Sequence, residues 1–353
     1  MHHFLSLVAM TLGILIILPQ KSIAYRLTPE SKCTSKRLDL QPGTASRIPI
    51  KDQDGTRLCT AFAASQLIDS WRTINDPPVT QFTSPIALAA EHAAMKGRND
   101  LGGFLSTEII ENARNLSSCS YNAVSDQFNQ KQSADFINEL AASFAMARGN
   151  NANLEVAANR AKSCLMAAGL FKNTISLASI SQHLLAQNRI QFISRILNDV
   201  CAGQKVPLTK IPPIVIERSA AHGSHNAGMP KMRDLINSRL DVSNPQPIGI
   251  TYCRDVLLDP NVTGVSERGF LTPATCKGEL HASVIVGRRL LRYQSEGRTK
   301  TICQFLVRDS YGTSCNAYKD DPSATPKEVC ERGQVWVDED ALMHNTSEVY
   351  HLK

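Results

Sequence analysis

The sequence predicts an α+β protein in which helices and strands are segregated along the chain. Residues 45–118 carry apolar positions at helical spacing around one cysteine, and residues 119–235 continue mostly in a helical pattern. Residues 236–353 change to short runs rich in β-branched residues and bounded by Gly, Pro and Asn. We therefore expect a helical lobe, a long helical insertion and a C-terminal antiparallel β lobe.

Residues 1–24 have the layout of a secretory signal peptide, with a mostly apolar run from Phe4 to Leu18 and small residues before a cleavage point expected after Ala24. The start carries no Lys or Arg, so an uncleaved membrane anchor is the alternative. No later run reaches 18 apolar residues. After cleavage we expect no membrane association and a secreted or periplasmic location, with residues 25–44 as an N-terminal segment.

The first helix is predicted to begin near Cys59, because "CTAFAASQLIDSW" places Ala, Phe, Leu and Trp at helical spacing without Gly or Pro. A second is predicted in "SPIALAAEHAAMKG", where Ser84 suits the cap and Pro85 the first helical position. A third is predicted in "STEIIENARN", with Ser106 and Thr107 as candidate caps. The lobe that carries Cys59 is therefore helical.

Residues 119–235 keep the helical pattern and break at "KVPLTKIPPIV" and "AHGSHNAGMP". Beyond them, "QPIGITYC", "HASVIVGRRLLRY", "KTICQFLVRDS" and "GQVWVDE" are predicted strands. Short strands in this order predict a small antiparallel sheet or barrel in the last third of the chain.

Charge and cysteine content exclude some classes of function. The formal charge of +6 is spread along the chain without a Lys/Arg run, so no nucleic-acid partner is expected. No CxxC or paired Cys/His spacing is typical of a structural zinc site, and neither a metal nor an organic cofactor is implied. Ten cysteines in an exported chain predict disulfides. If Cys59 stays a free thiol, nine remain, so at least one other is free or pairs between chains.

Cys59 is the first candidate for chemistry. A thiol at a helix N-terminus lies near backbone N–H groups without intrahelical partners and at the positive end of the helix dipole, and both favour the thiolate. The alternative is that Cys59 is a buried small hydrophobe or half of a disulfide.

A nucleophilic cysteine needs a base, an orienting group and donors for the oxyanion. His281 begins the predicted strand "HASVIVG", and Asp309 ends the next one, in "VRDSYG", where it can fix the imidazole tautomer while Tyr311 covers the pair from water. The alternatives are a structural, hydrogen-bonded histidine and a turn-forming aspartate before Gly312.

Read together, these segments resemble the papain-like cysteine peptidases. "DQDGTRLCTAFAA" is similar to their glutamine-to-cysteine segment, "LHASVIVG" to their histidine strand, and "VRDSYGTSC" to their Asn-Ser-Trp-Gly segment. The resemblance implies the papain-like two-lobe fold. It also implies Cys59 as nucleophile, His281 as base and then acid, Asp309 as orienting group, and Gln53 in the oxyanion hole beside the Cys59 N–H.

The same resemblance implies substrate-binding residues. "DLGGF" is similar to the family's glycine pair, which implies that Gly102 and Gly103 bind the substrate backbone, and Tyr311 lies in the place of a tryptophan beside the substrate. "QPIGITY" is similar to the strand that floors the S2 pocket.

The chain also departs from the family pattern. It lacks the first cysteine, the glycine and the aromatic of the C-G-[SA]-C-[WY] signature, and Asp309 replaces Asn. His281 follows Cys59 by 222 positions, against roughly 130 to 150 in papain. We assign the surplus to the insertion over residues 119–235.

Two disulfides are expected because they bracket short loops next to the candidate site: Cys253 with Cys276, and Cys315 with Cys330. The predicted function is a secreted cysteine endopeptidase that hydrolyses peptide or protein substrates through a Cys-His-Asp triad and an acyl-enzyme thioester. A transglutaminase-like or amidase acyl transfer and a non-catalytic papain-like binding protein are the alternatives.

Overall fold

The computed structural model describes most of the chain, namely residues 28–42, 44–114, 116–124, 132–149, 152–170, 175–218, 225–258, 276, 279, 280–295, 297–318 and 330–353. The predicted signal peptide, residues 1–24, lies outside the described residues. In the described part, no helix is long and apolar enough to cross a membrane.

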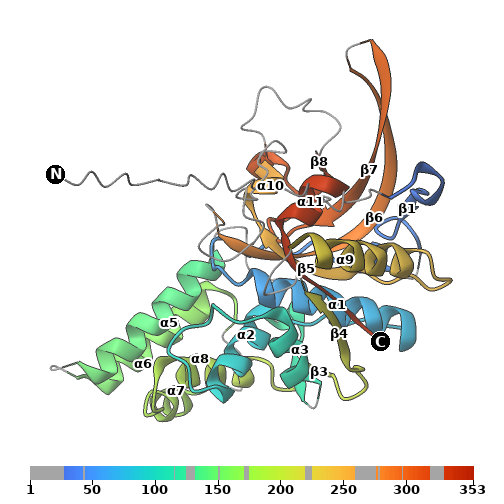
Figure 1. Ribbon diagram of the computed structural model, residues 1–353. Helices are drawn as coiled ribbons and strands as arrows, with labels where there is room; N and C mark the ends of the chain where they lie inside the picture. The colour runs from blue at the N-terminus through green and yellow to red at the C-terminus, as the bar shows by residue number, and fades with distance from the viewer. Residues whose placement is uncertain are drawn as a thin grey trace, which may run out of the picture.

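The described chain folds into a helical half and a sheet half that meet along α1 (Figure 1). The helices are α1 (Cys59–Asn75), α2 (Pro85–Met95), α3 (Ser106–Ala113), α4 (Tyr121–Val124), α5 (Gln132–Arg148), α6 (Leu154–Ala167), α7 (Leu177–His183), α8 (Arg189–Val200), α9 (His225–Leu240), α10 (Asp255–Leu258) and α11 (Glu339–Asn345). The strands are β1 (Lys36–Arg37), β2 (Ser117–Cys119), β3 (Lys205–Pro207), β4 (Ile214–Arg218), β5 (Ile248–Cys253), β6 (Leu280–Ser295), β7 (Arg298–Arg308), β8 (Cys330–Glu331), β9 (Gln334–Asp338) and β10 (Thr346–Leu352).

The helices of the first lobe form where the sequence predicts them. α1 begins at Cys59, and the Ser84 hydroxyl accepts a hydrogen bond from the Ala87 N–H at the start of α2, with Pro85 in the first position. α3 differs in detail, because Ser106 is already its first helical residue and Leu105 is the cap.

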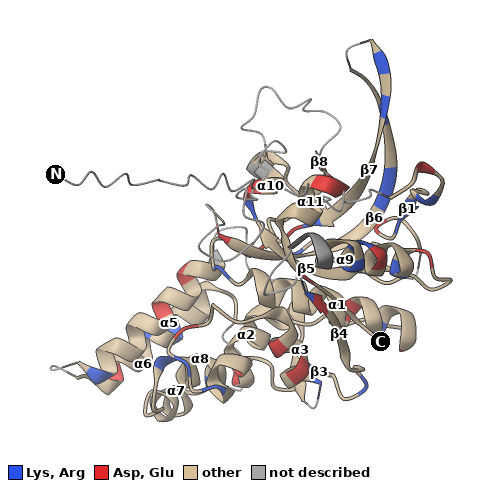
Figure 2. Ribbon diagram, viewed as in Figure 1, with Lys and Arg blue, Asp and Glu red and all other residues tan. Residues whose placement is uncertain are grey.

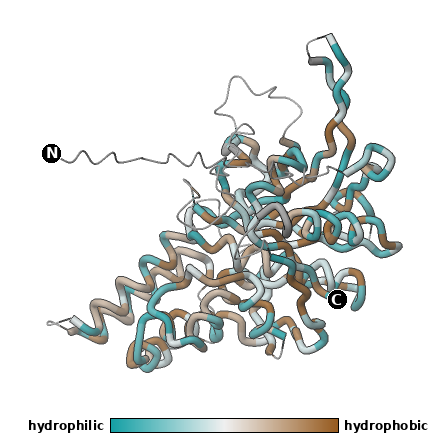
Figure 3. The backbone as a smooth tube through the Cα atoms, in the orientation of Figure 1, coloured by the Kyte–Doolittle hydropathy of each residue, from teal (hydrophilic) through white to brown (hydrophobic). Residues whose placement is uncertain are grey.

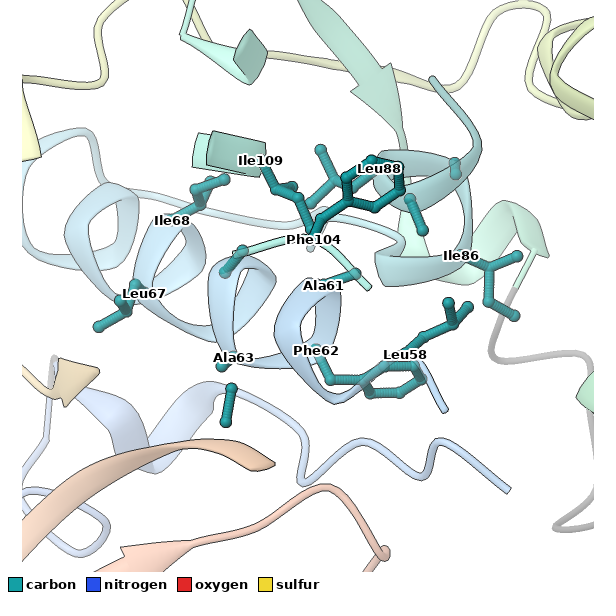
Figure 4. Close-up of a cluster of buried hydrophobic side chains, with 14 of the residues drawn as sticks. Leu58, Ala61, Phe62, Ala63, Leu67, Ile68, Ile86, Leu88, Phe104 and Ile109 are labelled. Atoms are coloured by element: carbon teal, nitrogen blue, oxygen red, sulfur yellow. The ribbon is translucent and has the colours of Figure 1, made fainter. Parts of the chain in front are cut away.

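The core of this lobe surrounds the start of α1 (Figure 4). Its buried side chains come from α1, α2, α3 and the segments before α1 and α3, and include Leu58, Ala61, Phe62, Ala63, Leu67, Ile68, Ile86, Leu88, Phe104 and Ile109. α1 packs against β6 on its other side. Because apolar burial surrounds the first turn, the position of Cys59 relative to the sheet is fixed.

The main sheet is antiparallel, in the order β4-β10-β5-β6-β7-β9-β8, with β1 paired to the outer part of β6. β4 lies within the range 119–235 predicted as the helical insertion, at one of the predicted breaks, yet it is the edge strand of this sheet, and α9 packs on it. β10 pairs with both β4 and β5, although no strand is predicted for its residues.

Within the range 119–235, the segment between β2 and β3 begins and ends at one place beside the first lobe; that the whole range is an insertion stays a prediction. β2 and β3 pair with each other, and the Cys119–Cys201 disulfide joins the same two ends of the segment. Between them α5 to α8 pack together, and α8 also packs on α2. This segment is therefore a helical layer on the outside of the first lobe, at the opposite end of the molecule from the β6–β7 hairpin (Figure 1).

The projecting β6–β7 hairpin differs in composition from the centre of the fold. Lys and Arg residues recur along the projecting β6–β7 hairpin (Figure 2). The tip of this hairpin is hydrophilic, whereas hydrophobic segments gather where the sheet meets the helices (Figure 3).

Four disulfides connect described cysteines. Both predicted pairs, Cys253–Cys276 and Cys315–Cys330, are confirmed. The other two, Cys33–Cys303 and Cys119–Cys201, join residues far apart in the sequence. Cys59 and Cys164 are free, as the odd count of the remaining cysteines requires.

Candidate active site

Cys59 is the first residue of α1 and lines a cleft of about 740 Å³ between the two lobes. Its neighbour Leu58 is buried, whereas Cys59 itself is partly exposed and forms no disulfide. A residue at this helical position has a backbone N–H without an intrahelical acceptor. Both the thiol and this N–H are therefore available at the cleft.

His281 lies on β6 in the other lobe, opposite Tyr252 of β5, and only 4% of its side chain is exposed. Its Nε2 lies 2.5 Å from Asp309 Oδ1, so Nδ1 is the ring nitrogen that remains for a second partner. Burial lowers the pKa of His281. The Asp309 charge, the hydrogen bond with Asp309 and the neighbouring Cys59 raise it by more, and the net result is a pKa of about 10. At neutral pH the imidazole is therefore protonated between the carboxylate and the thiol.

Asp309 follows β7 directly and is fully buried. The register pairs Val284 with Arg308, which brings Ser283 beside Asp309. Oδ1 accepts hydrogen bonds from the Ser283 hydroxyl at 3.0 Å and the Ser310 N–H at 2.7 Å, and Oδ2 accepts one from the Tyr318 hydroxyl at 2.9 Å. Burial raises the pKa of Asp309, but His281, the Ser310 N–H and the Tyr318 hydroxyl lower it below its usual value, so the group is a carboxylate.

Aromatic rings enclose the His281–Asp309 pair. The Tyr311 ring stacks on the imidazole with 5.7 Å between centroids and 8° between planes, and the Tyr252 ring meets it edge-on at 5.8 Å. The Arg254 guanidinium covers the Tyr311 ring at 4.5 Å. This shell keeps water from the pair, which strengthens its electrostatic interaction.

Gln53 lies on a loop that is held against the residues after Asp309. The Gln53 N–H donates to the Ser310 carbonyl at 2.8 Å, and the Gly312 N–H donates to the Lys51 carbonyl at 3.3 Å. The Lys51 ammonium is buried against the first lobe and donates to Asp69 Oδ2 at 2.7 Å. The loop is therefore anchored to both lobes, and it places the Gln53 side chain in the wall of the cleft.

The structure brings most of the predicted site residues together. Gln53, Cys59, His281, Tyr311 and Gly103 line the same cleft. Asp309 lies behind His281, as expected of an orienting group. Gly102 is the exception, because it lines a neighbouring pocket. Thr251 of the predicted S2 strand also lines the cleft.

Two residues that support the site, Ser283 and Tyr318, are absent from the sequence prediction. Ser283 follows His281 by two positions, so both side chains lie on the same face of β6. This two-residue spacing can be read from the sequence and could have identified Ser283. Its hydroxyl also lies 2.9 Å from the Tyr252 hydroxyl. Tyr318 has no comparable signal, because only the loop after β7 brings it back to Asp309.

In the described part of the chain, no group of three or more His, Cys, Asp or Glu side chains is arranged to hold a metal ion. The polar groups gathered at the cleft are instead a thiol, an imidazole, a buried carboxylate and an amide. Side chains of these types can act as a nucleophile, a proton carrier and oxyanion donors.

No protein-family model matches the chain, and no curated protein matches it. Among solved structures, it is similar to SERA5E from Plasmodium falciparum at 12% identity, with 93% of this chain and 96% of that chain covered and a TM-score of 0.48. It is also similar to xylellain, a cysteine protease from Xylella fastidiosa, at 16% identity, with coverages of 95% and 90% and a TM-score of 0.42.

A third similar structure comes from a study of the mite allergens Blo t 1 and Der p 1, at 12% identity, with coverages of 94% and 73% and a TM-score of 0.44. Likenesses this distant say nothing about activity, substrate or site residues. The similar solved structures include papain-like cysteine proteases. The helices and the main sheet of the described chain confirm the predicted α+β class, with a helical N-terminal region and an antiparallel C-terminal sheet.

Proposed function

We propose that this chain is a cysteine endopeptidase that hydrolyses peptide or protein substrates through Cys59, His281 and Asp309. The observation that carries the proposal is the position of His281. Its ring hydrogen-bonds a fully buried carboxylate of its own lobe, and the free thiol of Cys59 from the other lobe lines the same cleft and contributes to raising the pKa of the imidazole. A histidine with only a structural role does not need a free, partly exposed thiol at a helix N-terminus as its second partner.

In the proposed reaction the Cys59 thiolate attacks the carbonyl carbon of the substrate. Negative charge develops on the carbonyl oxygen, where the Cys59 N–H and the Gln53 amide are proposed to donate hydrogen bonds. The His281 imidazolium gives its proton to the leaving amine, and the C–N bond breaks to leave a thioester. His281 then takes a proton from water, whose oxygen attacks the thioester; the C–S bond breaks, the acid is released, and the Cys59 thiolate and the His281 imidazolium are restored.

The proposed location is outside the cytoplasm. Four disulfides between described cysteines favour an oxidising compartment, since disulfides are rare where glutathione keeps thiols reduced. Export through residues 1–24 and the choice between secretion and the periplasm remain predictions. Mass spectrometry of the N-terminus of the exported protein tests the expected cleavage after Ala24.

The direct test is intact-protein mass spectrometry after brief treatment with an epoxysuccinyl electrophile, followed by digestion of a peptide library. We expect a single adduct on Cys59, no adduct on Cys59→Ala and slow labelling of His281→Ala. Peptide cleavage is expected to fall by about 10²- to 10⁴-fold in His281→Ala. In Gln53→Ala it is expected to fall by about 10²- to 10³-fold, because an oxyanion donor is lost.

The alternatives give different results in the same experiment. Absence of an adduct on Cys59, with or without labelling of Cys164, contradicts the proposal and favours a binding protein. An adduct on Cys59 combined with products in which an added amine replaces water favours a transglutaminase-like acyl transfer. The Asp309 carboxylate favours this second reading, because transglutaminase-like enzymes also use Cys, His and Asp in this order.

A further inference from the structure

We infer that the helical insertion forms a second pocket beside the catalytic cleft, and that this pocket binds a bulky apolar side chain of the peptide substrate at a distance from the reacting bond. The inference rests on the proposed peptidase function and assigns part of its specificity to α5 and α8.

The pocket lies between the first lobe and the insertion and has a volume of about 460 Å³. Pockets that bind small molecules or side chains commonly fall in the range of about 300 to 1,000 Å³. One wall is the loop before α3, and the other is formed by α5 and α8. The residues of α5 and α8 that line it are Ala134, Ile137, Asn138, Ala141, Arg189, Ile190 and Ile193.

The pocket adjoins the catalytic cleft directly. Gly55, Arg57 and Gly103 line both the pocket and the cleft, whereas Gly102 lines only the pocket. Glycines at this boundary leave the backbone uncovered, and a Cβ built on Gly103 meets only the end of the Arg98 side chain, at 3.8 Å. An extended peptide in the cleft can therefore cross this boundary and direct a side chain into the pocket.

Apolar side chains of α5 and α8 form one part of the pocket lining, and polar groups form a comparable part. Ile190 and Ile193 are buried in α8, and Ile137 and Ala141 face them from α5 with partial exposure. Charged and polar groups stand at the rim, among them Arg57, Asp100 and Arg189. The apolar patch between α5 and α8, with charged side chains beside it, suits an aliphatic or aromatic side chain whose own backbone stays at the surface.

Both walls are tied to the loops that carry the catalytic cleft. Arg189, at the start of α8, donates from Nε to the Asn99 carbonyl at 2.7 Å, just before the glycine pair. On the other side, the N-terminus of α5 meets the loop of Gln53. Burial and the Asp52 charge raise the pKa of Asp54 there, and the Ser133 and Ala134 N–H groups lower it. The Arg189–Asn99 hydrogen bond therefore connects the α8 wall of the pocket to the loop of the glycine pair.

The test is digestion of an octapeptide library randomised at every position, with cleaved products identified by mass spectrometry. For the unmodified chain we expect Phe, Tyr, Leu, Ile or Met to be enriched about tenfold or more at one position that does not adjoin the cleaved bond, since a hydrophobic pocket discriminates by roughly 10- to 200-fold. Ala141→Trp, which fills the pocket, is expected to remove this enrichment and to leave the preferences next to the cleaved bond unchanged. Ile137→Ser, which makes the wall polar, is expected to weaken it.

The matched control is Ala145→Trp, which adds the same side chain one turn further along α5 at an exposed position outside the pocket. It is expected to behave like the unmodified chain. Absence of a distant preference, or a preference that persists in Ala141→Trp, overturns the inference. An equal loss of the distant preference in Ala141→Trp and Ala145→Trp also overturns the inference. It would mean that both substitutions act by destabilising α5 and not by filling the pocket.

A second readout separates failure of the pocket from failure of the peptidase function. The Cys59→Ala chain is irradiated with octapeptides that carry p-benzoylphenylalanine at each position in turn, and the crosslinks are mapped. Crosslinks to α5 or α8, lost in Ala141→Trp, support the pocket even if the unmodified chain cleaves nothing. Crosslinks elsewhere on the chain, or none, refute it even if Cys59 proves to be catalytic.

Discussion

Replacement of the buried carboxylate by an amide, Asp309→Asn, is the most informative single change at the site. Asparagine keeps the size of the side chain, and its oxygen still accepts from His281 Nε2, while its amide group faces the Tyr318 hydroxyl, which accepts as well as donates. The change therefore removes a negative charge beside the imidazole and retains the hydrogen-bonded arrangement.

The expected effect is a fall in the pKa of His281. A rise from 6.5 to about 10 corresponds to about 5 kcal/mol in favour of the imidazolium, at about 1.4 kcal/mol per pH unit. The Asp309 charge is the largest of the contributions that raise the pKa of His281, and an adjacent charge typically moves a pKa by about 1 to 3 units. We therefore expect a pKa of His281 between about 7 and 9 in Asp309→Asn.

The assay compares the rates at which iodoacetate and iodoacetamide alkylate Cys59 between pH 5 and pH 11. The imidazolium attracts the anionic reagent and has little effect on the neutral one, so the ratio of the two rates falls as pH rises through the pKa of His281. The control is Tyr318→Phe, which removes a hydrogen bond from Asp309 and keeps its charge. A midpoint near 6.5 in the unmodified chain, or the same midpoint in Asp309→Asn, would refute this account of the site.

Three further predictions concern other parts of the chain. Burial raises the pKa of Glu91 to about 7, so the fold loses stability as pH rises from below 4.5 through 7, by up to about 3 kcal/mol. Glu91→Gln should accordingly unfold at higher urea concentration than the unmodified chain at pH 9 and at nearly the same concentration at pH 4. Burial, and secondarily the Glu139 charge, raise the pKa of Cys164 to about 12. Iodoacetamide at pH 8 should therefore add to one cysteine per chain, and Cys164→Ser should give the same count; a second adduct would contradict this. Gly333 has φ +72°, and a Cβ there would lie 2.0 Å from the Gly312 carbonyl oxygen. Gly333→Ala should lower the free energy of unfolding by at least about 2 kcal/mol, and an unchanged urea midpoint would count against this packing.

Local signals in the sequence were enough to predict the elements that carry the site. A cysteine at the junction of a turn and an amphipathic run had to begin a helix, and α1 begins at Cys59. His281 and Asp309 lie at the ends of successive β-branched runs, and consecutive strands usually pair. The two disulfides that close short loops were predictable for the same reason, because their partners are near in sequence.

Contacts between distant segments left no such signal. β4 is short and lies among helices, and it enters the main sheet because β10 offers it an open edge. The Cys33–Cys303 disulfide joins residues 270 positions apart, and Tyr318 reaches Asp309 only through the path of a loop. Periodicity reports the face that a segment buries and does not report which segment covers it.

The sequence by itself thus determined the kinds of groups present and the element on which each lies: a thiol at a helix start, an imidazole and a carboxylate at strand ends, and a glutamine in the preceding loop. The tertiary structure decided their distances, the protonation of His281 and the second pocket. These depend on burial and on the approach of α5 and α8 to the glycine loop, and both follow from how complete lobes pack on one another.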